Sequence, residues 1–282
     1  MTRHIIIDPG GAEHPLDGSD GVTLLRDVSG REAPPYELDS DPAVGRQGGV
    51  LRRVRVAERD VTLPVLIESG TGTFRDRVRE LMTATNPRRG DSRLRVEYDD
   101  GDTFDLVGRV AEVVATGSDR YPGHQRATLV WRAFDPYWRG SEVVRGYTVD
   151  APDFFTVPDG FPLQLASATI SAVVSEDNAG DADAWPVWTI RGPGVPRLEN
   201  VTTDRVLEFD DLTLAVGDEL TVDTTPGVKT VEVNGDNVYD QLTLESSLFG
   251  LAPGVNMLNV DLEDGTEQSL VRLRYRPRTL AP

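Results

Sequence analysis

Apolar and polar residues alternate along much of the first half of the chain, which predicts short β-strands. The longest stretch of this kind is residues 50–69, where charged or polar side chains separate the apolar ones. A two-residue period is typical of strands with one buried and one solvated face. The apolar residues that define the period are Val54, Val56, Val61, Leu63 and Val65. Further strand patterns cover residues 4–7, 21–28 and 126–134.

One segment changes to the period of a helix. Thr73 followed by Asp76 resembles a capping box, in which side chains satisfy free N–H groups at a helix start. The apolar residues then recur at helical spacing, at Phe74, Val78, Leu81 and Met82. Pro87 cannot continue a helix. The sequence therefore predicts one α-helix over residues 73–85.

Turn-forming residues define a hairpin and a long loop. Residues 94–114 have the pattern of two strands joined by a turn at Asp99, Asp100, Gly101 and Asp102. Residues 32–49 are rich in Pro, Gly and acidic residues and predict a long loop. A loop of this length inside a compact domain usually has a function.

The second half of the chain predicts strands and no helix. Its strand patterns are separated by turns in which Gly or Asn permits a positive φ or Pro fixes φ. They cover residues 165–176, 186–192, 205–210, 220–224, 229–235, 256–262 and 269–277. This number and spacing is typical of a β-sandwich. The predicted fold class is therefore mainly β, with a small barrel or sandwich and one helix in the first half and a sandwich in the second.

The charge of the chain changes near its middle. Residues 1–145 carry 21 arginines and 24 acidic residues, whereas residues 146–282 carry 8 basic and 23 acidic residues. These counts give -3 and -15, which add to the net charge of -18. A step of this size indicates two domains with different surfaces. We place them at residues 1–140 and 141–282.

An aromatic stretch lies at this boundary. RAFDPYWRG, residues 132–140, ends a strand pattern, and its proline blocks continuation of the strand. We predict that the aromatic residues stiffen an inter-domain seam, formed by Trp131, Phe134, Pro136, Tyr137 and Trp138. On this interpretation, Trp138→Ala loosens the domain orientation and leaves each domain folded.

The sequence offers little for catalysis or cofactor binding. It has no cysteine and three histidines, none in a metal-binding spacing, and it lacks G-x-S-x-G, Walker A and G-x-G-x-x-G patterns. Its 47 carboxylates single out no glycosidase pair, although Glu208 with Asp210 or Asp211 can be imagined as one. Residues 177–183 are rich in Asp and Asn without the order of an EF-hand, which favours a loop over a calcium site. We predict that the protein is not an enzyme and that it binds no cofactor or metal.

Nucleic-acid binding and membrane insertion are not predicted either. Neither half has the Lys and Arg excess of a nucleic-acid binder. The apolar run Ile5–Ile7 is too short for a signal peptide, and no apolar stretch approaches the roughly 20 residues that span a bilayer. We expect a soluble chain that is made in the cytoplasm.

Several motifs follow one another in a distinctive order. The first half contains DGVTLL, RDVTLPVLIES with the helix TFRDRVRELMTATNP, LRVEYDDGDTFDLVGRV and LVWRAFDPYWRG. The second contains NAGDADAWPVWTIRGPG, RVLEFDDLTLAVGDELTVDT, VEVNGDNVYDQLTLESSLFGLAPGVN and a final strand ending in YRPR. Their number and order resemble the distal tail protein (Dit) family of long-tailed bacteriophages, over nearly the whole chain.

The resemblance implies a structural protein of the virion tail tip. It implies a ring-forming N-terminal tail domain with a β-barrel and a helix, followed by a galectin-like β-sandwich. Such proteins form a homo-hexameric ring around a channel for DNA and join the tail tube protein to the baseplate hub, a tail-associated protein. The tape measure protein and receptor-binding proteins are further candidate partners.

The charge step suits such a ring. A nearly neutral domain can meet its copies, whereas a domain of -15 radiates outward. By length and exposure, we expect the 32–49 loop and the 94–114 hairpin to reach a neighbouring subunit, through Pro34, Pro35, Tyr36, Asp99 and Asp100.

Carbohydrate binding is the main alternative. In that case the second domain is an adhesin that stacks host cell-wall glycan on Trp185, Trp188 or Tyr239. The alternation of Trp188 with Val187 and Ile190 favours a core position instead. A polysaccharide-degrading tail enzyme has only the unspecific carboxylates in its favour.

Overall fold

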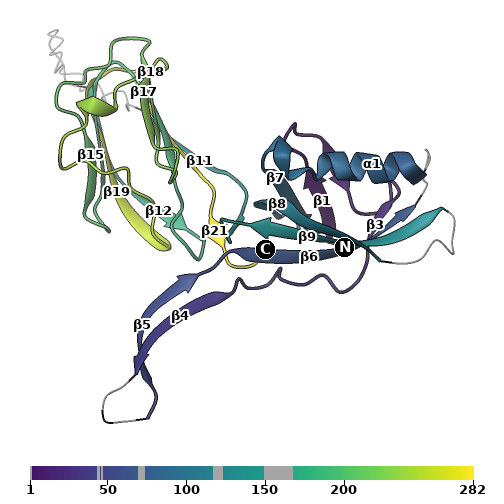
Figure 1. Cartoon of the computed structure of the whole chain (residues 1–282). Helices are drawn as coiled ribbons and strands as arrows, with labels where there is room; N and C mark the ends of the chain where they lie inside the picture. The colour runs from purple at the N-terminus through teal and green to yellow at the C-terminus, as the bar shows by residue number, and fades with distance from the viewer. Residues whose placement is uncertain (1, 43–44, 46, 69–73, 117–122, 149–167) are drawn as a thin grey trace, which may run out of the picture. The chain divides into compact units, whose positions relative to one another are not determined.

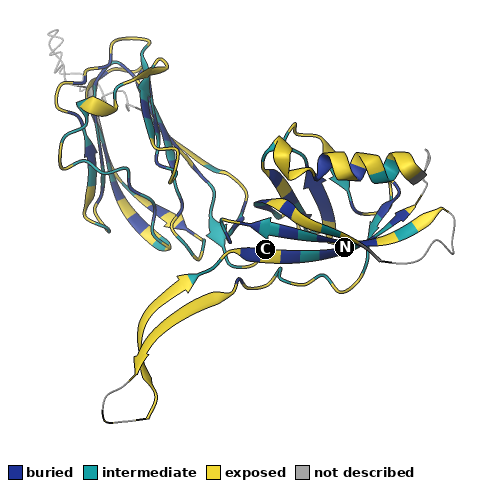
Figure 2. Ribbon diagram, in the orientation of Figure 1, coloured by how far each residue is buried: buried dark blue, intermediate teal, exposed yellow. Residues whose placement is uncertain are grey.

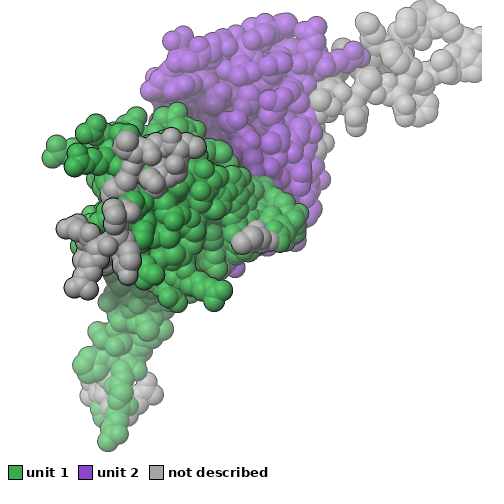
Figure 3. Space-filling model, turned by 90° about the vertical axis from the view of Figure 1, so that its right-hand side faces the viewer, with its two compact units in different colours: residues 1–141, 279–282 green, residues 142–278 purple. Residues whose placement is uncertain are grey.

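The computed structural model describes residues 2–42, 45, 47–68, 74–116, 123–148 and 168–282. The chain divides into two compact units, which are coloured separately in Figure 3. Unit 1 holds residues 1–141 together with 279–282, and unit 2 holds residues 142–278. Residues 279–282, predicted as part of the second domain, belong to unit 1. In the described part of the chain, no helix is long and apolar enough to cross a membrane.

Unit 1 is built on an antiparallel sheet that carries one α-helix (Figure 1). The strand order is β2-β1-β7-β8-β9-β6-β3, and β10 pairs with β8. The strands are β1 (Arg3–Ile7), β2 (Glu13–Pro15), β3 (Val22–Leu24), β6 (Arg59–Glu68), β7 (Ser92–Glu97), β8 (Thr103–Thr116), β9 (His124–Ala133) and β10 (Trp138–Arg139). The hairpin β7–β8 confirms the predicted turn between residues 98 and 102.

The predicted helix is confirmed as α1 (Phe74–Ala84), which packs against β6. Thr73, the proposed capping residue, lies outside the described residues. Leu81 is buried and Val78 is half-buried, but Met82 is exposed, so the apolar face is narrower than the spacing suggested. A short turn of 3₁₀ helix, η1 (Pro87–Arg89), follows the helix.

The core of unit 1 forms where β6 meets β9. Val61, Leu63 and Val65 are each fully buried and point to the same face of β6. Val61 lies opposite Trp131, and Leu63 lies opposite Leu129, both also fully buried. Alternation in the sequence therefore predicted both the strand and its buried face in this part of residues 50–69.

The first part of residues 50–69 does not contribute to this core, because it belongs to a separate hairpin. Residues 36–42, predicted as part of a loop, form β4 (Tyr36–Pro42), which pairs with β5 (Gly49–Val56). We call this two-stranded hairpin the arm. Figure 1 shows it projecting from the sheet of unit 1. The loop prediction is wrong here because acidic residues and a proline obscure a strand that has no core to face.

Unit 2 is a β-sandwich, as predicted. One sheet has the order β11-β20-β13-β16-β17-β18, and the other has the order β12-β19-β14-β15. Apolar side chains from both sheets fill the space between them. The first sheet holds β11 (Val143–Thr148), β13 (Val187–Arg191), β16 (Glu219–Asp223), β17 (Thr230–Val233), β18 (Asp236–Asn237) and β20 (Leu270–Tyr275). The second holds β12 (Ala168–Asn178), β14 (Val195–Asn200), β15 (Arg205–Glu208) and β19 (Gly254–Gly265).

The strand β14 was not predicted from the sequence. Its inward residues are Pro196, Leu198 and Asn200, so only one of the three is a typical buried strand residue. Asn200 is fully buried and its side-chain amide donates to the side-chain oxygen of Asn256, at 3.0 Å. A polar pair that is satisfied inside the sandwich thus hides the alternation. Among the described residues of unit 2, the only helical element is the 3₁₀ turn η2 (Tyr239–Gln241).

Candidate functional site: the arm and its root

The arm exposes both of its faces to solvent. Every residue of β4 and all but the last of β5 are exposed, which Figure 2 shows as a continuous exposed ribbon. The exposed apolar side chains are Tyr36 at 48%, Leu38 at 64%, Val50 at 40%, Leu51 at 56% and Val54 at 53%. An isolated two-stranded hairpin is marginally stable in water at best. The arm therefore exposes apolar side chains that the described part of its own chain does not cover.

The pairing register separates the arm into two chemically different faces. Tyr36 lies opposite Val56, and Leu38 lies opposite Val54. Because paired residues share a face of an antiparallel sheet, these four side chains form one apolar face. A bulge between Asp39 and Ser40 then shifts the register toward the tip.

The other face of the arm is charged. Glu37 pairs with Arg55, whose Nε lies 2.8 Å from Glu37 Oε2, and Asp39 lies opposite Arg53. Nearer the tip, Arg52 Nε donates to Asp41 Oδ2 at 2.6 Å. These pairs are exposed and contribute little stability each, about 0–1 kcal/mol. Their main effect is to make this face of the arm hydrophilic.

The arm begins and ends at a buried polar network, which we call the root. Arg59 follows β5 by three residues and is fully buried, and its Nη1 donates to the carbonyl oxygen of Arg31 at 3.0 Å. The indole Nε1 of Trp138 donates to the same oxygen at 3.2 Å. The guanidinium carbon of Arg59 also lies 5.9 Å from the centre of the Trp138 ring. Burial lowers the pKa of Arg59.

His4 joins the root to the sheet. Its Nε2 lies 3.1 Å from Nη1 of Arg31, and the ring is almost completely buried. Burial, together with the positive charge of Arg31, lowers the pKa of His4 to about 4. The imidazole is therefore neutral near pH 7 and can accept the hydrogen bond from Arg31.

The predicted seam residues do not behave as one group. Trp131 and Trp138 are fully buried in the core of unit 1 and Pro136 is buried, whereas Phe134 is 60% exposed and Tyr137 is intermediate. Trp138 thus belongs to the packing and hydrogen bonding of unit 1. Its truncation is expected to destabilise that unit, contrary to the expectation that both domains stay folded.

The residues expected to contact a neighbouring subunit also divide. Pro35 and Tyr36 are exposed at the start of the arm, and Asp99 and Asp100 are exposed at the β7–β8 turn. Pro34 is buried, so its prediction as a contact is wrong for the folded chain. The carbonyl oxygen of Pro35 accepts a hydrogen bond from the amide of Ala57 and so closes the base of the arm.

The candidate glycan-stacking residues are only partly available. Trp188 is 1% exposed and lies in the sandwich core, which rules it out as a stacking surface. Trp185 is intermediate, and its ring lies against Gly250, where a Cβ would approach Trp185 Cζ3 to 2.9 Å. Tyr239 is 45% exposed in η2. The structure therefore does not assemble the three aromatics into one platform.

The 177–183 segment contains the last two residues of β12 and a loop that Asn178 closes. Asn178 is buried, and its Nδ2 donates to the carbonyls of Ala182 and Leu251, at 3.0 and 2.9 Å. Its Oδ1 accepts the amide of Gly180 at 3.1 Å. These hydrogen bonds give Asn178 a structural role that requires no bound ion. Among the described residues, no group of three or more His, Cys, Asp or Glu side chains is placed to hold a metal ion.

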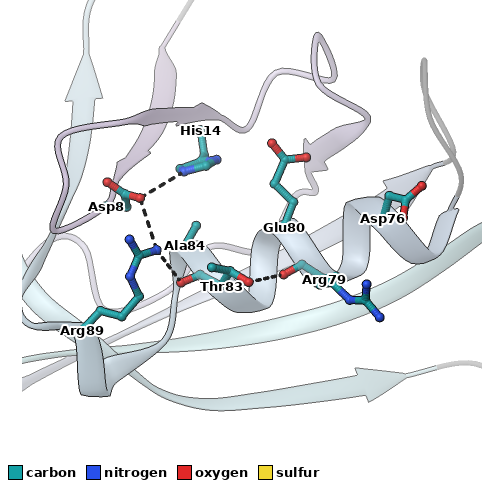
Figure 4. Close-up of a pocket in the computed structure, with 8 residues that line it drawn as sticks. All are labelled: Asp8, His14, Asp76, Arg79, Glu80, Thr83, Ala84 and Arg89. Carbon is teal, nitrogen blue, oxygen red and sulfur yellow. Dashed lines mark hydrogen bonds and ion pairs between the residues drawn. The ribbon is translucent and has the colours of Figure 1, made fainter.

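A pocket of about 330 Å³ lies between α1 and the segment that joins β1 to β2 (Figure 4). Asp8 Oδ2 faces His14 Nε2 at 3.9 Å and Arg89 Nη1 at 3.7 Å. Backbone amides, chiefly that of Ala12, hold the pKa of Asp8 below its usual value. The remaining lining residues are Asp76, Arg79, Glu80, Thr83 and Ala84. Acidic and basic groups are mixed around the pocket, so it selects neither a cation nor an anion.

Comparisons with known proteins agree with this architecture. Residues 179–278 match the family model described as siphovirus-type tail component, C-terminal domain. The chain is similar to the crystal structure of SPP1 Dit, described as a paradigm of the hub adsorption apparatus in phages that infect Gram-positive bacteria. The two share 18% identity at a TM-score of 0.66, over 97% of this chain and 98% of that one.

Two baseplate structures are also similar. Chains of the phage P2 baseplate in its activated conformation, with Ca and with Sr, are each 10% identical, with TM-scores of 0.52 and 0.50 and the same coverage. No curated protein matches the chain at a significant level. The resemblance seen in the sequence is thus confirmed: residues 179–278 match the model of a siphovirus-type tail component, C-terminal domain, and the chain has the fold of SPP1 Dit along nearly its whole length.

Proposed function

We propose that this protein is a structural component of a phage tail tip, in which unit 1 uses the arm to bind further copies of the chain. The observation that carries the proposal is the apolar face of the arm, formed by Tyr36, Leu38, Val54 and Val56, three of which are strongly exposed. The likeness to SPP1 Dit and to phage baseplate chains supports a role in a tail or baseplate assembly.

The apolar face has the properties of a surface that is buried in an assembly. Burial of a single side chain such as Leu38 stabilises a complex by about 1.5–3 kcal/mol, and the face offers several. The charged side chains of the opposite face keep the free arm in solution and discourage edge-to-edge pairing. An arm with one apolar and one charged face therefore favours one orientation on its partner.

The distribution of charge favours a second copy of unit 1 as that partner. Unit 1 carries 20 arginines against 23 acidic residues, and unit 2 carries 9 basic against 24 acidic residues, giving -3 and -15. Copies of unit 1 can pack together with little repulsion, whereas copies of unit 2 repel one another unless they are separated. A closed ring of unit 1 domains with unit 2 outside it meets both conditions.

In this function the ring is a homo-hexamer at the virion tail tip, and it joins the tail tube protein to the baseplate hub around a channel for DNA. Unit 2 then faces the hub or the receptor-binding proteins. The role is architectural and requires no catalysis. It also requires no base-specific contact with DNA, because a channel serves passage of DNA and not its recognition.

Self-association of arm variants tests the proposal. Leu38→Asp places a charge on the apolar face, and Asp39→Asn changes the charged face next to it. We expect sedimentation velocity to show a ring-sized species for the native chain and Asp39→Asn, and monomers for Leu38→Asp. If Leu38→Asp assembles as the native chain does, the arm is not the assembly surface. Circular dichroism establishes that both variants are folded.

A further inference from the structure

Residues 279–282 follow unit 2 in the chain but are part of unit 1. They enter through β21 (Arg278–Thr279), which pairs with β10 and appears in yellow beside the sheet of unit 1 in Figure 1. The carbonyl oxygen of Leu280 accepts a hydrogen bond from Nη2 of Arg59. The carbonyl oxygen of Pro282 lies 3.2 Å from the hydroxyl of Tyr98, which donates to it.

The contact at Leu280 matters because Arg59 is a fully buried cation. Among the described residues, no carboxylate lies within ion-pair distance of its guanidinium. Its charge is instead met by two carbonyl oxygens, those of Arg31 and Leu280, and by the face of the Trp138 ring. A buried charge that loses a partner is strongly destabilising, so each of these acceptors is important.

Arg59 also stands where the arm meets the sheet. It lies three residues after β5, and its other acceptor, Arg31, lies five residues before β4. The amide of Ala57 donates to the carbonyl of Pro35 at 2.9 Å and closes the same junction. One guanidinium therefore links both ends of the arm to a segment that is distant in the sequence.

We propose that residues 279–282 act as a clasp that completes the root of the arm, so that unit 1 becomes competent to assemble only after the residues beyond unit 2 have been made. This inference rests on the proposed function for its assembly step, but not for the clasp itself. During synthesis, residues 1–141 are complete long before residue 280 exists. Until then Arg59 lacks one of its two carbonyl acceptors and the arm is held loosely, which delays self-association of unfinished chains.

A double-mutant cycle on the full chain tests the clasp. The variants are a chain that ends at residue 278, Arg59→Met, and their combination, all studied as monomers at low concentration. Arg59→Met replaces the buried cation by an apolar side chain of similar length, which buried sites often accept. The amides of Ser29, Ala57 and Thr62 report on the root by hydrogen exchange, because they form its backbone hydrogen bonds.

We expect the truncation to speed exchange at these amides by about tenfold or more in the Arg59 background and by much less in the Arg59→Met background. Tyr98→Phe, which removes only the contact with Pro282, is the matched control and should leave the root nearly unchanged. The clasp is overturned if the truncation has no effect, or the same effect in both backgrounds. The truncated chain with Arg59 could also fail to fold while the truncated Arg59→Met chain folds. That outcome supports the clasp, because the need for residues 279–282 then depends on the buried charge of Arg59.

The assembly step is then measured on the same samples. We expect the truncated chain to lose ring-sized species in sedimentation velocity and Tyr98→Phe to keep them. Full assembly by a truncated chain whose root exchanges rapidly would overturn the coupling between clasp and assembly. If the native chain itself stays monomeric, the proposed function fails, whereas the exchange measurements on monomers still decide the clasp.

Discussion

The strands β5 and β6 are consecutive and both carry apolar residues at two-residue spacing, yet only one of them contributes to a core. In β6, Val61 and Leu63 are fully buried against β9. In the arm, Leu51 and Val54 are more than half exposed. A two-residue period thus predicts a strand with one apolar face, but it does not show whether residues of the same chain bury that face. For the arm, we infer that the covering surface comes from another copy of the chain.

A large effect is expected from the contrast between a leucine of β6 and a leucine of the arm. Leu63→Ala should lower the free energy of unfolding of unit 1 by about 2–5 kcal/mol, because it leaves a cavity in the core. Leu38→Ala should change it by less than about 0.5 kcal/mol in the monomer, because its side chain is already in solvent. Urea denaturation of monomeric protein compares the two, and equal losses would contradict the contrast.

Trp138 tests the boundary of unit 1 in a similar way. Trp138→Ala should cost about 3–5 kcal/mol, because it removes a buried indole, its hydrogen bond to Arg31 and the ring beside Arg59. Phe134→Ala, four residues earlier and 60% exposed, is the control and should cost much less. A small loss for Trp138→Ala would restore the interpretation of this residue as a seam between independently folded domains.

A smaller effect concerns pH and the junction between the arm and the sheet. The pKa of His4 is about 4 in the folded chain and about 6.5 when unfolded, so between these values the unfolded chain binds more protons. Stability from this group is therefore complete above pH 6.5 and is lost as the pH falls toward 4, by up to about 3 kcal/mol.

Thermal unfolding of the native chain and of His4→Gln across this range measures that effect. His4→Gln keeps a hydrogen-bond acceptor for Arg31 and removes the titration, so its stability should fall less on acidification. His14→Gln, on the neighbouring strand β2, is a control at another histidine of the same sheet. An unchanged pH profile for His4→Gln would show that His4 is not the titrating group.

The smallest effect is expected on the charged face of the arm. Arg55→Gln breaks the exposed pair with Glu37 and should change monomer stability by no more than about 1 kcal/mol. It should also leave self-association nearly intact, in contrast to Leu38→Asp. If Arg55→Gln abolishes assembly instead, the charged face is the one that the partner covers.

Parts of this architecture could be predicted because their signals are local. The period of residues 59–68, the helical spacing after residue 73 and the turn residues of unit 2 each follow from the side chains of one element. Arg59 could also have been found, because it precedes Val61 and Leu63 at two-residue spacing and so falls on their buried face. A charged residue at such a position signals a buried polar network.

Other features depend on residues that are distant in the sequence. Buried Trp138 contacts Arg31 and Arg59, and residues 279–282 contact Arg59 through Leu280. β14 hides its alternation because Asn200 is satisfied by Asn256, which is 56 residues away. The surface proposed to cover the arm could not be predicted from local patterns either, because it belongs to another copy of the chain.

The most direct test of the central claim is a crosslink from the arm between copies. A photoreactive amino acid at position 38 is introduced, and light and heavy isotope-labelled chains are mixed before assembly. We predict crosslinked peptides that join the arm of one label to unit 1 of the other, at the frequency expected for random mixing. Rings that form while position 38 crosslinks only within its own copy would contradict the account.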